Sequence, residues 1–479
     1  MAKALIWFRK DLRLSDNPAL AAALRDGYAP VPVYVHAPDE EGDWAPGAAS
    51  LAWLDRSLRR LHAGLDTLGS GLVVVSGPSK QALERLALAH GAEAVYWNRR
   101  YEPAVVARDT AIKSDLRGLG IAARSFNGSL LVEPWQVETG DGGPYRVFTP
   151  YWKKAAGHLG HIRVSDAPGS LPSLPEGLDA DCVGEPAIDA LELGPSPRWD
   201  TGFWERFTPG EGGAQDALGA FADDAARSYL DLRDRPDRTG TSRLSPHLHF
   251  GEISPRQVAV QLRERVGSPA AERHVQGYVR ELGWREFSHH LLHHFPDTVT
   301  RNLNPRFEDF PWRDDADGLA AWQRGRTGVP IVDAGMRELW HTGWMHNRVR
   351  MIVASFLTKN LRLHWHHGAR WFWDTLVDAD LANNTQGWQW TAGTGADAAP
   401  YFRVFNPVTQ ATKFDPDGDY IRRWCPELAK LPTKAVHAPW EHDGERRRLA
   451  PDWPQAPIID LADSRRAALA AYDTVKGPR

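Results

Sequence analysis

Leu5-Ile6-Trp7-Phe8, Ser15-Asp16-Asn17-Pro18 and Val31-Pro32-Val33-Tyr34-Val35 follow one another near the start of the chain and decide its fold. The first and third segments are short apolar runs that are typical of buried strands. The segment between them is a helix start, because a side chain that can cap the helix stands directly ahead of a proline in the first turn. The chain therefore begins as an alternation of strands and helices.

This alternation continues to about residue 126. Residues 50–68 carry leucines at helical spacing, and residues 72–75, 94–97 and 122–126 are further strand-like runs. Because these strands are continuously apolar, we expect a parallel sheet that is covered by helices on both faces. No G-x-G-x-x-G follows the first strand, so the ordinary dinucleotide-binding fingerprint is missing.

The rest of the chain has a different pattern. Residues 160–215 are rich in Pro, Gly, Ser and acidic residues, which predicts a long connector on the surface. From there to about residue 440 the sequence is helical, with capping signals such as Ser254-Pro255, and one late helix is expected near residues 461–472. We expect an α/β domain over residues 1–135, an interdomain linker over 136–210 and an all-α domain over 211–479.

Composition narrows the function classes. The chain has 479 residues, a formal net charge of -4 and 21 Trp, so no global basic field indicates nucleic acid, although a local basic face remains open. Its two cysteines, Cys182 and Cys425, exclude a disulfide framework and favour a reducing, cytoplasmic location. We recognise no signal peptide and no membrane-spanning run. The surplus of tryptophan suggests stacking on flat ligands or electron transfer.

The segment Thr342-Gly343-Trp344-Met345-His346-Asn347-Arg348-Val349-Arg350-Met351 is the most informative one for function. On a helix, Trp344, Asn347, Arg348 and Met351 would lie on one side. The segments Asp378–Asn384 and Trp388–Trp390 add acids, amides and further tryptophans. Soluble helical cores rarely bury so much charge unless it is paired around something. From the residues alone, structural ion pairs and a ligand site explain this pattern equally well.

Other candidates are weaker when taken one at a time. Glu281, Trp284 and Arg285 share one helical face, where Glu281 is either a surface acid or a proton-handling group in a partly desolvated pocket. The hydroxyl-rich run Thr241–Ser245 either caps a helix or holds phosphates. Widely spaced tryptophans are most simply core packing. The histidine-rich runs lack carboxylate or cysteine partners at ligand-like spacing, so we expect no metal site.

Together, these residues closely resemble the photolyase/cryptochrome family, and the resemblance covers nearly the whole chain. The matching segments, in the order of the family, are Trp7–Asn17, Thr241–Ser245, Trp284–Phe287, Gly328–Ala334, Gly343–Arg348, Asp378–Leu381 and Gly387–Trp390. The resemblance implies an α/β antenna domain with a Rossmann-like parallel sheet, a long linker and an all-α domain that holds a U-shaped FAD.

The resemblance also implies residue roles around FAD. The residues that match FAD-binding positions are Tyr229, Thr241, Ser242, Arg243, Leu244, Ser245, Trp284, Arg285, Asn347, Arg350, Asp378, Ala379, Asp380 and Asn384. Arg350 paired with Asp378 would offset the charge of a reduced flavin, and Asn384 would face flavin N5. Trp388, Trp365 and Trp312, in that order outward, match the electron relay that photoreduces FAD.

The implied substrate is UV-damaged DNA. A pyrimidine dimer would be flipped out of the duplex into a pocket over the flavin. The residues expected to contact the DNA or the dimer are Arg233, Glu281, Trp284, Arg348, Met351, Trp390 and Arg403. Excited FADH⁻ would pass an electron to the dimer, and Glu281 would stabilise the charge that develops on it.

A few positions separate the branches of the family. Plant-type signalling cryptochromes usually carry Asp where this chain has Asn384, and they lack the counterparts of Trp284 and Met351. Enzymes for (6-4) lesions carry His where this chain has Asn347. These positions favour repair of cyclobutane pyrimidine dimers over a cryptochrome photoreceptor or a (6-4) photolyase. A light-independent flavin oxidoreductase would need a nicotinamide site, for which we see no fingerprint. Residues 97–103 and 142–148 are similar to the plant-cryptochrome-like, class III branch.

The antenna chromophore is a further expectation. One branch binds methenyltetrahydrofolate through an Asn-Glu pair, which would align near Ala104-Val105 and is absent here. We expect 5,10-methenyltetrahydrofolate in a different pocket, ahead of 8-hydroxy-5-deazaflavin. We also expect a monomer that makes no membrane contact.

Overall fold

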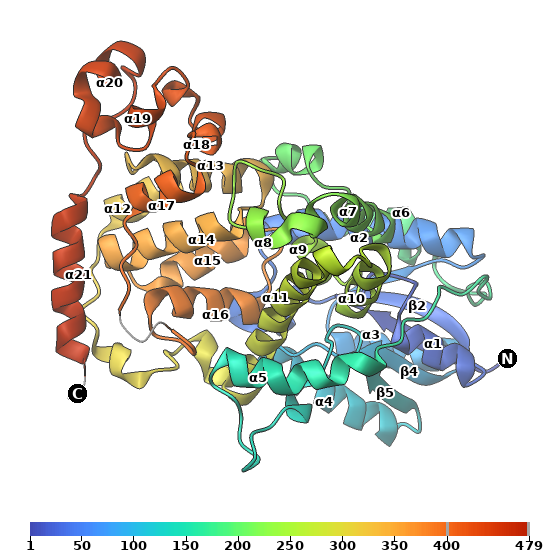
Figure 1. The fold of residues 1–479 in the computed structure, drawn as a ribbon. Helices are drawn as coiled ribbons and strands as arrows, with labels where there is room; N and C mark the ends of the chain where they lie inside the picture. Colours follow the sequence, from blue (N-terminus) through green and yellow to red (C-terminus); the bar gives the residue numbers. More distant parts are fainter. Residues whose placement is uncertain (399–401, 477–479) are drawn as a thin grey trace.

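The structure, a computed structural model, describes residues 1–398 and 402–476 (Figure 1). Its first part is a five-stranded parallel sheet with strand order β3-β2-β1-β4-β5. The strands are β1 (Lys3–Phe8), β2 (Ala29–His36), β3 (Val73–Ser76), β4 (Ala92–Asn98) and β5 (Ala122–Phe126). All five strands predicted from the sequence are confirmed, as is the helix that begins at Pro18 under an Asn17 cap.

Helices cover both faces of the sheet, as continuous apolar strands require. Ala4, Ile6 and Phe8 of β1 pack with α1 (Pro18–Arg25) and α2 (Ala48–Thr67). Leu5 and Trp7 point to the opposite face, where α3 (Ser79–His90) and α4 (Pro103–Gly118) cover them. Successive residues of a strand face opposite sides, so a run without polar alternation buries both faces.

The segment after the sheet combines irregular chain with short helices. It contains α5 (Phe148–Ala155) and α6 (Gly184–Asp189), and Val183 forms an isolated bridge with Val73 at the sheet edge. The connector expected over residues 160–215 therefore does follow the surface of the α/β part, and α7 begins near its end, at Glu211.

The remaining described residues form helices and loops. The helices are α7 (Glu211–Asp223), α8 (Tyr229–Leu232), α9 (Ser245–His249), α10 (Pro255–Arg265), α11 (Pro269–His294), α12 (Ala316–Gln323), α13 (Pro330–Thr342), α14 (Asn347–Ser355), α15 (Trp365–Thr375), α16 (Leu381–Ala392), α17 (Pro407–Phe414), α18 (Asp419–Trp424), α19 (Thr433–Val436), α20 (Asp443–Leu449) and α21 (Leu461–Val475). In Figure 1, α21 lies along the edge opposite the sheet, and α18 to α20 project from the bundle. None of the described helices is long and apolar enough to cross a bilayer.

One local prediction was wrong. Trp344 does not share a helical face with Asn347, Arg348 and Met351, because α13 ends at Gly343 with φ 65° and α14 begins only after the His346 cap. Trp344 lies between the two helices, and its ring joins the core cluster that contains α1 and α2. Its indole N–H donates to Ser245 Oγ at 3.1 Å.

The two parts of the molecule share core residues. Phe250, Trp344 and Val377 of the helical part are buried in the same cluster as α1 and α2. The fully buried carboxylate of Glu252 accepts hydrogen bonds from Trp53 Nε1 at 3.0 Å and from Ser57 Oγ at 2.6 Å, both on α2. The helical part is therefore fixed against the sheet by polar as well as apolar contacts.

Candidate functional site

A cavity of about 410 Å³ opens between α11, α14 and α16 in the helical part. It collects most of the predicted site residues from segments far apart in sequence. Those that line it are Arg233, Glu281, Trp284, Asn347, Arg348, Arg350, Met351, Asp378, Ala379, Asp380, Asn384, Trp388 and Trp390. Its volume falls in the range of about 300–1,000 Å³ that is usual for organic ligands and cofactors.

A buried ion pair forms one wall of this cavity. Arg350 Nη2 donates to Asp378 Oδ2 at 2.8 Å, and Arg350 Nε donates to the carbonyl of Met345 at 2.8 Å. The Asp378 side chain is only 4% exposed, and its Oδ1 has no hydrogen-bond partner among the described residues. A buried carboxylate oxygen without a partner is costly, so this wall offers an acceptor to a ligand N–H.

A second acid, Asp380, lies at the N-terminus of α16. Its side chain caps the helix by accepting from the backbone N–H of Asn383 at 2.9 Å, and His289 Nε2 lies 3.5 Å from its other oxygen. Burial alone would raise the pKa of the Asp380 carboxyl, but His289 and Arg285 outweigh burial and hold that pKa well below its ordinary value. Asp380 is therefore a fixed negative charge at the cavity wall.

Asn384 and Trp388 bring α16 against α15. Asn384 lines the cavity, and its Nδ2 donates to the carbonyl of Ala369 at 2.9 Å, which leaves the amide oxygen available as an acceptor. Trp388 is 2% exposed and lies against Gly368, where an added Cβ would come within 2.0 Å of the indole. Gly368 follows Trp365 by one helical turn, so the glycine lets Trp388 approach the turn of α15 that carries Trp365.

Arginines paired with acids stand at the rim. Arg233 Nη1 donates to Glu281 Oε1 at 2.5 Å, and Arg348 Nη2 donates to Asp234 Oδ1 at 2.8 Å. Trp284 stacks on Phe148 of α5 with a centroid distance of 3.7 Å and an interplanar angle of 11°. Phe148 thus fixes the plane of Trp284, because one face of the indole is already covered.

Several predicted residues lie outside the cavity lining. Thr241–Ser245 forms a loop whose last residue begins α9; in it Ser242 Oγ lies 2.8 Å from Tyr278 Oη, and Tyr229 packs against the same Tyr278. Trp344 connects this loop to the cavity, since the guanidinium groups of Arg243 and Arg350 lie 6.0 and 5.9 Å from its ring. Leu244 is fully buried.

Arg285 and Arg403 also point elsewhere. Arg285 Nη1 donates to the carbonyl of Ser129 at 2.8 Å, so it joins α11 to the segment that follows the sheet. Arg403 lines a neighbouring cavity that shares Trp390 with the first one. Trp365 is fully buried in the helical core, and Trp312 is half-buried at the edge of that core.

The sequence did not single out several lining residues: Ser288, Ala354, Phe372, Leu376, Asn383, Gln386, Gly387 and Thr391. It also missed Asp234, the ion-pair partner of Arg348. Most are apolar or small and carry no chemical signal of their own. Asp234 follows Arg233 directly, and this adjacency is the one signal that would have placed it at the rim.

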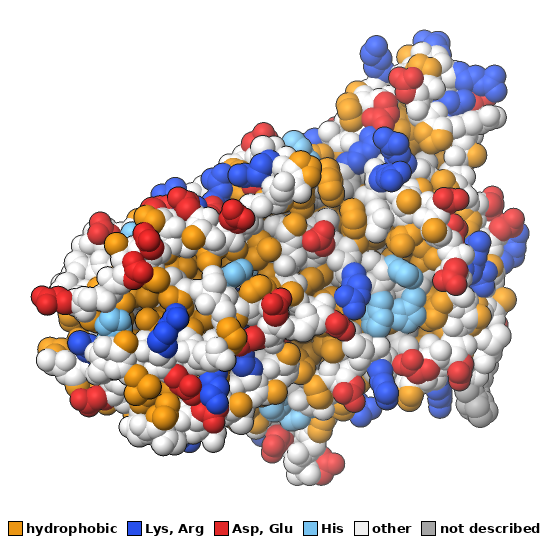
Figure 2. Space-filling view, turned by 180° about the vertical axis from the view of Figure 1, so that it is seen from behind, with side chains coloured by type: hydrophobic (Ala, Val, Ile, Leu, Met, Phe, Trp, Pro, Cys, Tyr) orange, Lys and Arg blue, Asp and Glu red, His pale blue; other side chains and the backbone are white. Residues whose placement is uncertain are grey.

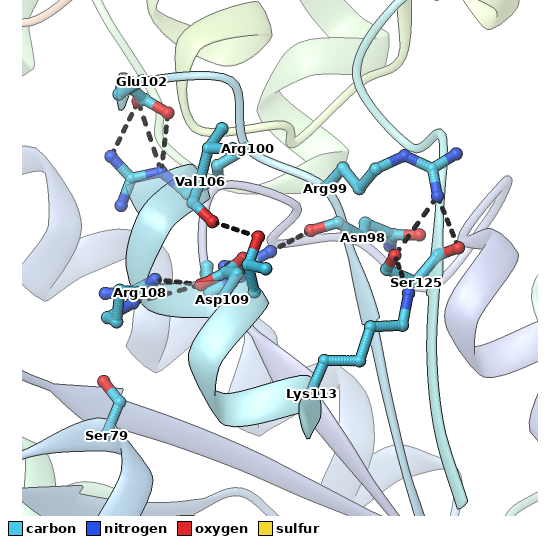
Figure 3. A network of polar contacts seen from close by, with 12 residues as sticks. Ser79, Asn98, Arg99, Arg100, Glu102, Val106, Arg108, Asp109, Lys113 and Ser125 are labelled. Carbon is cyan, nitrogen blue, oxygen red and sulfur yellow. Dashed lines mark hydrogen bonds and ion pairs between the residues drawn. The ribbon is translucent and has the colours of Figure 1, made fainter. Parts of the chain in front are cut away.

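A second, smaller crevice lies between the sheet and the helical part. It is lined by residues at the carboxyl ends of β1 and β2 and by His249, Trp373 and Ala379, so Ala379 borders both cavities. Its volume is only about 50 Å³, because ion pairs fill the space. Arg100 pairs with Glu41 at 2.6 Å and with Glu102 at 2.7 Å, and Figure 3 shows the latter pair beside Arg108 and Asp109.

Comparison with known proteins fits this geometry. Residues 4–171 match the sequence model "DNA photolyase", and residues 278–474 match "FAD binding domain of DNA photolyase". The deoxyribodipyrimidine photo-lyase of Agrobacterium fabrum is 46% identical over 99% of this chain and 98% of its own length. The chain belongs to the DNA photolyase/cryptochrome family.

Solved structures and plant relatives place the chain within the family. The crystal structure of a bacterial class III photolyase from Agrobacterium tumefaciens superimposes with a TM-score of 0.93 at 46% identity, covering 99% of this chain and 98% of that one. Cryptochrome-1 of Arabidopsis thaliana is 40% identical over 91% of this chain, which spans 64% of the longer plant protein. The predicted fold class, a parallel α/β domain followed by a helical FAD-binding domain, is confirmed.

Proposed function

We propose that this protein is a photolyase, a carbon–carbon lyase that splits cyclobutane pyrimidine dimers in DNA with light and FAD. The observation that carries the proposal is the joint lining of one cavity by Glu281, Trp284, Trp390 and the Arg350–Asp378 pair. A chain 46% identical over its whole length is named deoxyribodipyrimidine photo-lyase. Light-driven repair is favoured over a signalling role because Asn384, Trp284 and Met351 all border this cavity.

The cavity suits the isoalloxazine ring of FAD. Asp378 Oδ1 is a buried acceptor that no described residue fills, and Arg350 provides a positive charge beside it. Asn384 presents its amide oxygen, because its Nδ2 is held by Ala369, and an oxygen accepts from a protonated ring nitrogen. We further assign the loop Thr241–Ser245, with Tyr229, to the FAD phosphates and ribose. When bound, FAD supplies the light-absorbing group that lends one electron to the dimer and receives it back.

The residues at the rim would handle the DNA. Arg233 and Arg348 are held by Glu281 and Asp234, so they are pre-oriented to meet phosphates. Trp284 and Trp390 offer flat faces on which the flipped dimer stacks. Glu281 hydrogen-bonds the dimer and stabilises the charge that develops there. Arg403 extends this contact surface toward the neighbouring cavity.

The overall surface charge does not by itself explain DNA binding, so the contacts at the cavity rim are needed. Figure 2 shows acidic and basic side chains interspersed over the face behind the view of Figure 1, with Lys and Arg dense on the projecting segment around α20. That helix carries Arg446, Arg447 and Arg448. The net charge of -4 also provides no long-range attraction for DNA. Specific binding therefore depends on the arginines at the rim.

As the antenna we propose 5,10-methenyltetrahydrofolate rather than 8-hydroxy-5-deazaflavin. In doubly wound sheets, ligands bind outside the carboxyl ends of the strands at the point where the strand order reverses. In this chain that crevice offers about 50 Å³, and Arg100 in its wall forms ion pairs with Glu41 and with the adjacent Glu102. Figure 3 shows the pair with Glu102. A tricyclic chromophore would have to displace these pairs, which favours a folate held in a different pocket.

Repair of a cyclobutane dimer in an oligothymidine tests the proposal. The purified, photoreduced protein is illuminated with blue light, and recovery of thymine absorbance is compared with a dark control. Recovery that requires light is the expected result. If a protein that retains FAD fails to repair the cyclobutane dimer but repairs a (6-4) lesion, it is a (6-4) photolyase. If it repairs neither lesion, it is a cryptochrome-type photoreceptor.

A further inference from the structure

The indole of Trp365 makes one directed hydrogen bond within the described part of the chain. The indole N–H donates to Asn302 Oδ1 at 2.9 Å, and both residues are buried. Asn302 in turn donates to Glu308 Oε1 twice, from its backbone N–H at 2.8 Å and from Nδ2 at 3.1 Å. Because the amide nitrogen is committed to a carboxylate, the amide oxygen must face the indole. A chain of hydrogen bonds therefore runs from an exposed carboxylate to the buried ring.

The segment that carries Asn302 is fixed on the helix that carries Trp388. Gln389 Nε2 donates to the carbonyls of Thr298 and Arg301 at 2.8 and 2.9 Å, and Gln389 Oε1 accepts from the backbone N–H of Leu303 at 2.9 Å. Gln389 is 1% exposed. Because this buried amide makes all three bonds, the loop over residues 298–303 has little freedom. The position of Asn302 is therefore fixed by the fold.

Two imidazoles also lie close to Trp365. The His366 ring lies 3.9 Å from the Trp365 ring, and the His364 ring lies 5.7 Å from Trp365 and 5.1 Å from Trp312. Burial lowers the pKa of both histidines, that of His366 to about 4, so both are uncharged at neutral pH. Neither histidine then opposes a positive charge on Trp365, whereas Glu308 favours one.

We propose that Glu308, acting through Asn302, stabilises the positive charge on Trp365 while an electron passes along the tryptophan relay. This inference rests on the proposed function and on the relay order Trp388, Trp365, Trp312. One electron moves from Trp365 to oxidised Trp388, which restores Trp388 and leaves Trp365 as a radical cation. An electron from Trp312 then restores Trp365.

The chemistry of the acceptor matters as much as its charge. An amide oxygen is a good hydrogen-bond acceptor but a very weak base, so Trp365 keeps its indole proton in the hydrogen bond to Asn302. A radical that keeps its proton can be reduced by electron transfer alone. Glu308 and Asn302 are thus positioning residues that favour the inner step, and neither lines the cavity proposed for the flavin.

Glu308→Gln is the decisive variant, because glutamine retains an acceptor oxygen for Asn302 and removes only the charge. Its matched control is Asp309→Asn, which removes a charge from the neighbouring exposed residue; no hydrogen bond or ion pair of Asp309 is found in the described part of the chain. The measurement is transient absorption of tryptophan radicals after a light pulse on the oxidised holoenzyme, together with the yield of flavin photoreduction. We expect a yield roughly threefold lower and a shorter-lived radical in Glu308→Gln only. Equal yields and lifetimes in the two variants would overturn the inference.

Asn302 variants supply a readout that a merely structural role would not change. Asn302→Asp places a base on the indole, so the deprotonated, neutral tryptophan radical should replace the radical cation in the spectrum. Asn302→Leu should shift the Trp365 indole N–H signal in ¹⁵N-tryptophan NMR spectra of the dark holoenzyme, because the hydrogen bond is lost. If both variants fold normally and the radical-cation spectrum is unchanged in Asn302→Asp, the proposal is contradicted.

Trp365→Phe separates this inference from the function on which it rests. If flavin photoreduction in Trp365→Phe equals that of the wild type, the relay order itself is wrong. If Trp365→Phe fails to photoreduce but Glu308→Gln behaves as Asp309→Asn does, the relay stands and only the role of Glu308 is rejected. Light-dependent dimer repair by chemically reduced protein should be unaffected in all these variants.

Discussion

Arg350 and Asp378 lie 2.8 Å apart at the cavity wall, and this single contact leaves the second oxygen of Asp378 buried without a partner among the described residues. The two residues come from α14 and from the loop before α16, so the pair also connects separate elements. An arginine on one oxygen and a ligand N–H on the other would satisfy the carboxylate completely.

Asp378→Asn is expected to weaken FAD retention about a hundredfold or more, since removing one partner of a buried pair costs roughly 3–5 kcal/mol and each 1.4 kcal/mol is about tenfold. The substitution leaves Arg350 without its counter-charge and presents an N–H where an acceptor is needed. Flavin content after dialysis, read from visible absorbance, is the measurement. Asp314→Asn, at an exposed position, serves as the control and should retain flavin as the wild type does.

Glu281→Gln is expected to lower dimer repair per absorbed photon about tenfold, while affinity for dimer-containing DNA changes by about twofold or less. Glutamine keeps the hydrogen-bonding shape but loses the charge that pairs with Arg233. Glu272→Gln, on an exposed turn of the same helix, is the matched control. Equal repair yields in the two variants would show that Glu281 only orients Arg233.

Gly368→Ala is expected to displace Trp388, because a Cβ at this position would come within 2.0 Å of the indole. Overpacking of this kind costs about 1–3 kcal/mol in stability. Flavin photoreduction should fall with it, since the spacing between Trp388 and α15 changes. Thermal unfolding and photoreduction yield measure the two effects. Gly212→Ala, where the added methyl meets nothing within 4 Å, should leave both unchanged.

Glu286 should make the folded protein less stable as pH rises. Burial raises the pKa of this carboxyl from 4.5 to about 7, although Arg285 and the backbone N–H groups of Leu131 and Val132 oppose the rise. Between these two pH values the folded state binds more protons than the unfolded state, so the free energy of unfolding falls as pH increases.

Glu286→Gln should remove this dependence while keeping an acceptor for the N–H groups of Leu131 and Val132. Urea unfolding of wild type and variant at about pH 5 and about pH 8 provides the comparison. The wild type should lose up to about 3 kcal/mol more than the variant between these conditions. A parallel pH dependence in both proteins would show that the Glu286 carboxyl titrates normally.

The fold could be predicted from the sequence because its signals are local. Leu5–Phe8 and Val31–Val35 are apolar throughout, and Asn17 ahead of Pro18 is a cap that needs no tertiary contact. The position of Trp344 could not be predicted in this way. Helical spacing places it beside Asn347 and Arg348, but the positive φ of Gly343 breaks the helix and turns Trp344 toward the sheet domain.

Site residues with polar, reactive side chains could be predicted from the sequence. Residues that only shape the site by packing were harder to predict. Arg350, Asp378 and Asn384 are polar residues in a mostly apolar, helical stretch of sequence and could be singled out. Phe148 and Gly368 carry no such signal, yet one fixes the plane of Trp284 and the other admits Trp388. Arg285 illustrates the converse, because a charged residue on the expected helical face turns to Ser129 instead. Only the packing of α11 against the segment after the sheet decides that direction.

The burial of Trp344 and Val377 in the core beneath α2 limits how such proteins can recombine. A chimera that grafted the first 135 residues of a relative onto this helical half would place foreign side chains against Trp344, Val377 and the Glu252 carboxylate. Replacing the first 135 residues by those of a relative should therefore yield insoluble protein, unless the residues on both sides of these contacts come from the same parent. An antenna of a different kind is then more readily acquired by substitutions within the existing first half than by wholesale replacement of it.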